Sequence, residues 1–431
     1  MSTQKKSNAL AIVVMILLFG MISFVTNLAS PMGDVLKNQF DVANWMGTLG
    51  VFANFIAYAC MGIPAGNLLQ KRGYKFTALA AVIVGFAGVG VQTIAGLLNG
   101  NLAFGVYLLG AFIAGFSMCM LNIVVNPMLN KLAGGGNRGN QLLQVGGSFN
   151  SFMGTAVIFL TGIFVPKIAD AEIKQVFPLM FIALAIFALA FVVILFTHIP
   201  ENERIASVDD KKDSKIGPMS FRHFMLGAIA IFIYVGVEVG IPNVLQKWLQ
   251  NGGLSNAAGN AESIAATVAA TYWLLMFFGR LAGAALGAKF SAKAMLTSVS
   301  LLGLVLVGGA MVLDPANTVN LPVFKGTEGF GLAEVPVNAA LLVLCGLCTS
   351  VMWGGIFNLA VEGLGKYTER ASGIFMALVC GGGILPLLQN GIVDWTGNYL
   401  TSYWVIAAGL AYLLYYALVG SKNVNKDIKT E

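Results

Sequence analysis

The sequence is poor in charged side chains and in the residues that usually carry catalysis. Only 10% of its 431 residues are charged, 57% are hydrophobic, and just two are histidines. Soluble globular proteins average about 25% charged residues, so this composition excludes a water-soluble enzyme and a disordered chain. The net charge of +6 is spread over many loops and makes no basic face for nucleic acid. We therefore expect an integral membrane protein with no nucleic-acid partner.

Several kinds of site are also missing from the sequence. Cys345 and Cys348 form an isolated CxxC without a second pair or a nearby histidine, so no metal site is predicted. Both histidines, His198 and His223, flank a charged central segment, which excludes a histidine proton relay within the membrane. The chain has no GxxxxGK[ST] motif for ATP, no clustered catalytic acids and no ring of charges for a channel. We expect neither enzymatic activity nor an organic cofactor.

Twelve apolar segments dominate the chain, and each is near the length of about 20 residues that a membrane-spanning helix needs. Segment 199–222 divides them six and six, and nine of the fifteen residues from Glu201 to Lys215 are charged. The predicted fold is all-α, with six-helix bundles at 1–198 and 223–431 joined by a cytoplasmic linker at 199–222. The segments lie near 9–33, 45–69, 76–98, 104–130, 141–166, 176–197, 223–248, 264–287, 294–313, 336–361, 371–393 and 400–420.

The distribution of lysine and arginine predicts the orientation of these segments. With the N-terminus inside, inner loops and tails hold nineteen of the 25 basic residues, outer loops hold five, and Arg280 falls within a segment. Inner loops of membrane proteins carry the excess of positive charge. We therefore expect both termini in the cytoplasm of a bacterial inner membrane. The five basic residues assigned to outer loops are Lys37, Lys167, Lys174, Lys247 and Lys325.

The two halves of the chain repeat weakly. Glycines and a basic turn recur in segments 66–75 and 283–293, and Arg138 and Arg370 each shortly precede the next span. Parallel six-helix halves of this kind are typical of transporters with a site at the membrane midplane, between the halves. Segment 66–75 resembles the loop signature of the major facilitator superfamily, although Gln70 stands where an aspartate is usual.

Longer stretches resemble the fucose:proton symporter family within that superfamily. The resemblance implies the two-bundle major facilitator fold and a monomer that imports a monosaccharide with protons by alternating access. A hexose, a 6-deoxyhexose and an N-acetylhexosamine all remain open as substrates. The similar stretches are Phe24–Phe40, Asn126-Pro127, Gly147–Phe152, Tyr234–Gly240, Phe278–Arg280 and, less specifically, Ala371–Gly373 and Gly381–Gly383.

Two acidic residues are candidates for proton coupling, because an ionisable group at the centre of a membrane helix costs roughly 2.5–3.5 kcal/mol. Asp34 ends the first segment, and the resemblance implies that it is the family's proton-linked aspartate; the alternative is an interfacial residue near Lys37. Glu238 lies in the middle of the seventh segment. It is predicted to carry a proton or to bind sugar, and the alternative is a structural ion pair with Arg280.

The chain departs from the resemblance at Asn122, where the family carries a glutamate. Asparagine does not titrate, so one proton-linked acid is missing. A sugar uniporter and a sodium-coupled sugar carrier on the same fold therefore remain alternatives to proton symport.

Amide side chains and tryptophans within the spans are the expected sugar ligands, because sugars combine hydroxyl groups with an apolar face. The alternative is that the amides only join helices. The predicted ligands are Asn27, Asn122, Asn126, Asn150, Asn243, Gln246, Trp273, Trp353, Asn358, Gln389 and Asn390. Gating or structural roles are predicted for Lys71, Arg72, Arg280, Glu362 and Arg370. Arg280 has a further alternative, which is to bind the carboxylate of an acidic sugar.

Overall fold

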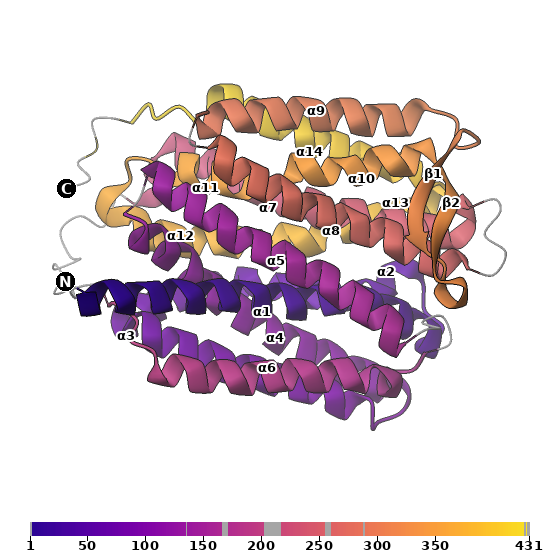
Figure 1. Ribbon diagram of the computed structural model, residues 1–431, viewed down its shortest axis with the longest axis horizontal. Coiled ribbons are helices and arrows are strands. Elements are labelled where there is room, and N and C mark those ends of the chain that lie inside the picture. The colour runs from indigo at the N-terminus through magenta and orange to yellow at the C-terminus, as the bar shows by residue number, and fades with distance from the viewer. Residues whose placement is uncertain are drawn as a thin grey trace.

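The computed structural model describes residues 2–134, 136–165, 171–201, 217–254, 260–287, 289–425 and 428. Its long helices run side by side along one axis (Figure 1). Helix α1 begins and α14 ends at one end of this bundle, here called the termini end. The opposite end carries a β-hairpin and is called the hairpin end.

The first half of the chain, here called the N half, supplies six crossings. Its helices are α1 (Ser2–Phe40), the short α2 (Asn44–Gly47), α3 (Leu49–Ala95), α4 (Gly100–Leu132), α5 (Gly136–Phe164), the 3₁₀ turn η2 (Ile173–Val176) and α6 (Phe177–Phe196). At about 1.5 Å per residue, the 47 residues of α3 are far too long for a single span of about 30 Å. The chain reverses inside α3 at Gly73, whose φ of 84° suits glycine.

The second half, here called the C half, also supplies six crossings. Helices α7 (Arg222–Trp248), α8 (Ala261–Leu286), α9 (Ala292–Val312) and α14 (Trp404–Tyr415) are continuous. Two spans are broken into α10 (Val337–Thr349) with α11 (Met352–Val361), and α12 (Thr368–Ala377) with α13 (Gly381–Thr396). Short helical turns complete this half: η3 (Pro218–Ser220), η4 (Leu249–Gly253), η6 (Gly365–Tyr367), η7 (Leu378–Cys380), η8 (Leu400–Tyr403) and η9 (Tyr416–Gly420).

These elements confirm the predicted number of spans. Eleven helices in the described part of the chain are long and apolar enough to cross a membrane, and α3 accounts for two crossings. Two of the predicted spans, 336–361 and 371–393, are present but interrupted. In the first, the hydroxyl groups of Thr349 and Ser350 donate to the carbonyls of Cys345 and Leu347. Such side-chain bonds compete with the helical ladder and favour a break.

A β-hairpin between α9 and α10 was not predicted. Strand β1 (Thr318–Phe324) pairs antiparallel with β2 (Phe330–Pro336), so that Phe324 faces Phe330 beside the 3₁₀ turn η5 (Gly326–Glu328). Gly326 and Gly329, with φ of 64° and 78°, make the tight connection. The carbonyl and amide of Phe324 both bond the Thr267 hydroxyl, which holds the hairpin against α8.

Most of the predicted linker, 202–216, lies outside the described residues. Glu201, the last described residue before that gap, accepts hydrogen bonds from the backbone amides of Tyr74 and Lys75, at 2.8 and 2.9 Å. The Lys75 ammonium in turn donates to two carbonyls at the end of α6, those of Leu195 and Thr197. A negative charge at a helix start and a positive charge at a helix end are both favourable. These contacts hold the chain to the N half as far as Glu201.

Candidate functional site

A cavity lies between the two halves, near the middle of the helices. It is lined by residues of α1, α3, α4 and α5 from the N half, and of α7, α8, α11 and η7 from the C half. The space that it leaves for the centres of water-sized molecules is about 110 Å³. Since one water needs roughly 10–15 Å³ by this measure, the cavity holds several waters or a small polar molecule in their place.

Arg280 joins three helices at the edge of this cavity. Its Nη2 atom lies 3.1 Å from Glu238 Oε1 on α7, and its Nη1 donates to the Gly147 carbonyl on α5 at 2.6 Å. The side chains of Arg280 and Glu238 are only 7% and 11% exposed. The pair compensates two charges that would each be costly inside a membrane. The bond to Gly147 also crosses from the C half to the N half.

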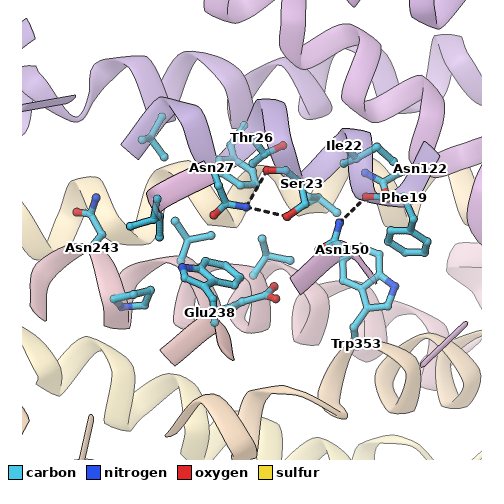
Figure 2. Close-up of a pocket in the computed structure, with 18 of the residues that line it drawn as sticks. Phe19, Ile22, Ser23, Thr26, Asn27, Asn122, Asn150, Glu238, Asn243 and Trp353 are labelled. Carbon is cyan, nitrogen blue, oxygen red and sulfur yellow. Dashed lines mark hydrogen bonds between the residues drawn. The ribbon is translucent and has the colours of Figure 1, made fainter. Parts of the chain in front are cut away.

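The polar face of α1 lines the cavity through Ser23, Thr26 and Asn27. Figure 2 shows the Asn27 amide nitrogen directed to the backbone carbonyl and hydroxyl of Ser23, each at 2.9 Å. The Asn150 nitrogen likewise donates to the Phe19 carbonyl at 2.9 Å. A carbonyl oxygen can only accept a hydrogen bond, so each amide must direct its nitrogen to the carbonyl. The side-chain oxygens of Asn27 and Asn150 therefore remain available as acceptors. The buried Thr26 hydroxyl has no hydrogen-bond partner within the described structure.

A second group of polar residues connects the two halves through α4. Asn122 donates to the Tyr58 hydroxyl at 3.0 Å, and Asn126 donates to the carbonyl and side-chain oxygens of Asn122. The Trp353 indole N–H reaches Asn126 Oδ1 at 3.3 Å. Asn126 is fully buried behind the cavity and does not line it, whereas Tyr58, Asn122 and Trp353 do. Asn126 therefore orients the Trp353 ring.

Seven of the predicted sugar ligands line the cavity together with Glu238 and Arg280. They are Asn27, Asn122, Asn150, Asn243, Gln246, Trp273 and Trp353. The other four predicted ligands, Asn126, Asn358, Gln389 and Asn390, are not among its lining residues. Asn126 is on the unbroken helix α4, whereas Asn358 is on α11 and Gln389 and Asn390 are on α13, both in interrupted spans. Which face of each helix meets the cavity depends on packing. Ser23, Thr26 and Tyr58 were not predicted, although Ser23 lies one helical turn before Asn27 on α1 and Thr26 lies about one turn after Ser23.

Asp34 lies outside the cavity lining, toward the hairpin end of α1. It is partly buried, and the positive charges of Lys247 and Lys37 act on it. The assignment of Lys247 to an outer loop was wrong. Lys247 lies in the last turn of α7 and is only 7% exposed. Its ammonium bonds Thr48 Oγ1 and Asn390 Oδ1, both at 2.9 Å.

At the termini end, the halves meet through glycines rather than through the predicted charged residues. A methyl group at Gly62 of α3 would lie 2.8 Å from the Ala377 Cα and 2.7 Å from the Gly373 carbonyl oxygen, both on α12. Lys71, Glu362 and Arg370 are exposed, and the Arg72 guanidinium lies 5.4 Å from the ring centre of Phe76 on its own helix. The gating roles of these four residues stay predictions, whereas Arg280 does bridge the halves.

The family profile described as Major Facilitator Superfamily matches residues 10–387. The chain belongs to the Major Facilitator Superfamily. It is therefore a membrane transporter and not an enzyme. Among relatives, it is 28% identical over 429 residues to the glucose/galactose transporter of Brucella abortus (strain 9-941), covering 98% of this chain and 97% of that protein.

It is also 24% identical over 423 residues to the L-fucose-proton symporter of Escherichia coli (strain K12), and the aligned region covers 91% of this chain and 90% of that protein. A crystal structure of the superfamily transporter FucP in the outward conformation matches with a TM-score of 0.74 and 21% identity, over 97% of this chain and all of that one. The match confirms the predicted two-bundle fold. In the present structure the halves touch at the hairpin end through Lys247 and Thr48.

Proposed function

We propose that this transporter carries a neutral monosaccharide through the cavity between its halves by alternating access. The observation that carries the proposal is the set of free acceptors in the lining. Asn27 and Asn150 keep their side-chain oxygens as acceptors after the bonds described above. Sugar hydroxyl groups are donors that suit these acceptors. The rings of Trp273 and Trp353 supply flat apolar surfaces for a sugar face.

The pairing of Arg280 argues against an acidic sugar. Its guanidinium is the only positive group among the residues that line the cavity in the described structure. That group already serves Glu238 and the Gly147 carbonyl. A substrate carboxylate would have to displace Glu238 and leave that carboxylate buried without a partner, which is costly. The names of the relatives, which mention glucose, galactose and fucose, also favour neutral sugars.

For coupling, we favour proton symport through Asp34. Glu238 has a compensating arginine, whereas Asp34 lies where the two halves meet at the hairpin end, close to the Lys247 contacts. Gain or loss of a proton at Asp34 would change the charge balance at that junction. Sodium coupling and facilitated diffusion are the competing proposals, since Asn122 replaces an acid. The proposed orientation has the termini end in the cytoplasm of a bacterial inner membrane, and the proposed working unit is the monomer.

The test is uptake by proteoliposomes offered a panel of labelled sugars: glucose, galactose, fucose, N-acetylglucosamine and glucuronate. We expect accumulation of at least one neutral sugar under an inward proton gradient, its loss with an uncoupler, and no uptake of glucuronate. Asp34→Asn should abolish accumulation but retain sugar exchange. Accumulation driven by a sodium gradient alone would overturn proton coupling, and uptake of glucuronate in preference to the neutral sugars would overturn the choice of substrate class.

A further inference from the structure

Lys247 is a buried cation for which neither the cavity nor the predicted coupling residues account. It lies on the last turn of α7 at the hairpin end and is only 7% exposed. A charged side chain inside a membrane helix is costly, and such residues usually have a function. A lysine that served only to anchor the helix end would extend toward water, whereas this one is directed to the junction between the halves.

The ammonium group of Lys247 contacts both halves of the transporter. It donates to the hydroxyl of Thr48, which immediately precedes α3 in the N half, at 2.9 Å. It also donates to the side-chain oxygen of Asn390, on α13 in the C half, at 2.9 Å. Thr48 and Asn390 are 1% and 0% exposed. Hydrogen bonds from a charged donor are about twice as strong as neutral ones, so this link contributes to holding the hairpin end closed.

The position of Asn390 is itself set by its neighbours. Its amide nitrogen donates to the Pro386 carbonyl at 2.7 Å and to Asn243 Oδ1 at 3.2 Å. These bonds require Asn390 to present its oxygen, the acceptor that an ammonium needs. Asn243 lines the cavity, so the contacts of Lys247 are continuous with the site.

The charges around Lys247 come from the elements packed beside it. Asp34 and Lys37 lie on α1, and Asp394 lies on α13. Asp394 also accepts a hydrogen bond from the backbone amide of Trp45 on α2, at 3.3 Å, which is a second and exposed contact between the halves. Burial and the positive charge of Lys37 act against the ammonium form of Lys247, whereas the negative charges of Asp34 and Asp394 favour it.

We propose that Lys247 is the latch of the hairpin-end gate. Its ammonium holds Thr48 of the N half against Asn390 of the C half, and the hairpin end opens when this contact breaks. Lys247 is thus a positioning residue for the transport cycle. The proposal rests on membership of a family of transporters and is independent of the sugar and of the coupling ion.

The experiment measures the opening of each end by double electron–electron resonance in the full chain, with its five cysteines replaced. One pair of spin labels replaces the exposed residues Asn101 and Ala316, in the N and C halves at the hairpin end. A second pair replaces the exposed Lys71 and Lys289 at the termini end. In Lys247→Met we expect the ratio of hairpin-end-open to closed molecules to rise at least tenfold, while the termini-end distance does not lengthen.

Two controls separate a latch from a residue that merely supports folding. Lys174→Met neutralises an exposed lysine at the same end, on η2, and should leave both distances unchanged. Lys247→Arg keeps the charge and the donors and should retain most of the closed population. An unchanged hairpin-end distance in Lys247→Met, or lengthening at both ends, would overturn the proposal.

Thr48→Val keeps the proposal testable if Lys247→Met fails to fold. Valine has nearly the volume of threonine, so this substitution removes only the hydroxyl group that accepts from Lys247. It should open the hairpin end in the same direction by a smaller factor. Where both variants fold, Thr48→Val added to Lys247→Met should produce little further opening, because the two residues share one contact. Full additivity of the two effects would show that Lys247 acts elsewhere and would also overturn the proposal.

Discussion

Single residues determine the chemistry of the cavity through the hydrogen bonds that they have already made. Asn27 and Asn150 spend their amide nitrogens on backbone carbonyls and keep their oxygens, as Figure 2 shows. Arg280 spends its donors on Glu238 and on the carbonyl of Gly147. The lining is thereby left rich in acceptors and without an unpaired positive charge in the described structure. This state favours a neutral molecule that carries hydroxyl groups.

The Glu238–Arg280 pair supports a prediction about stability. Arg280→Met leaves the Glu238 carboxylate buried without its partner, and removal of one member of a buried pair costs about 3–5 kcal/mol. We expect a clearly lower melting temperature in detergent for this variant. The double variant Glu238→Gln, Arg280→Met has no buried charge left at this place and should recover much of the loss. If the double variant melts below both single variants, the pair does not act as a compensated unit.

At the scale of elements, the interrupted helices contribute residues to the cavity, and the hairpin joins the two halves at one end. Trp353 lies in the first turn of α11, just after one break, and Val379 lies in η7 at the other. Irregular backbone within a membrane is tolerated where it is buried in protein or faces a cavity. The hairpin has a different role, because the rings of Phe324 and Phe330 pack on Phe159 of α5 in the opposite half, with centres 6.4 and 6.5 Å apart.

This aromatic contact should help to close the hairpin end. An aromatic pair contributes about 0.5–1.5 kcal/mol beyond its buried area, so Phe330→Ala should raise the hairpin-end-open to closed ratio roughly two- to tenfold. Spin labels at residues 101 and 316 measure this change. Leu332→Ala is the matched control, since Leu332 is an exposed residue of the same strand, as Phe330 is, but carries no ring to pack on Phe159. Equal effects of the two substitutions would mean that the ring contact does not join the halves.

For the whole molecule, the decisive property is that the halves contact each other at both ends of one cavity. At the hairpin end the contacts are polar and aromatic, through Lys247 and Phe159. At the termini end they are close approaches of glycine-containing helices, α3 and α12, at Gly62 and Gly66. In alternating access the halves rotate against each other about the cavity, so the contacts at the hairpin end and those at the termini end must break one after the other. Each set can therefore be disturbed separately.

Gly62→Leu should prevent closure of the termini end, because the new side chain would overlap the backbone of Gly373 and Ala377. We expect uptake by proteoliposomes to fall at least twentyfold while the protein stays monodisperse. Gly90→Leu, in the second arm of α3 beyond the reversal at Gly73, is the control, since nothing lies within 4 Å of the position of a new Cβ there. Uptake near the wild-type rate in Gly62→Leu would show that this close approach is not needed in the transport cycle.

The sequence by itself determined that the molecule is a helical membrane protein, because a membrane allows very few backbone structures to span it. Apolar segments of spanning length and the placement of 25 basic residues are sufficient to predict helices and a six-plus-six arrangement. Asn27, Asn150 and Trp273, which were predicted as ligands because they are amides or tryptophans within spans, do line the cavity. Tertiary structure alone decided which amide atoms are already bonded, that Gln389 and Asn390 are not among the residues that line the cavity, and that Lys247 is buried between the halves. The physical reason is that hydropathy depends on the local segment, whereas hydrogen-bond partners and close helix contacts depend on residues hundreds of positions apart.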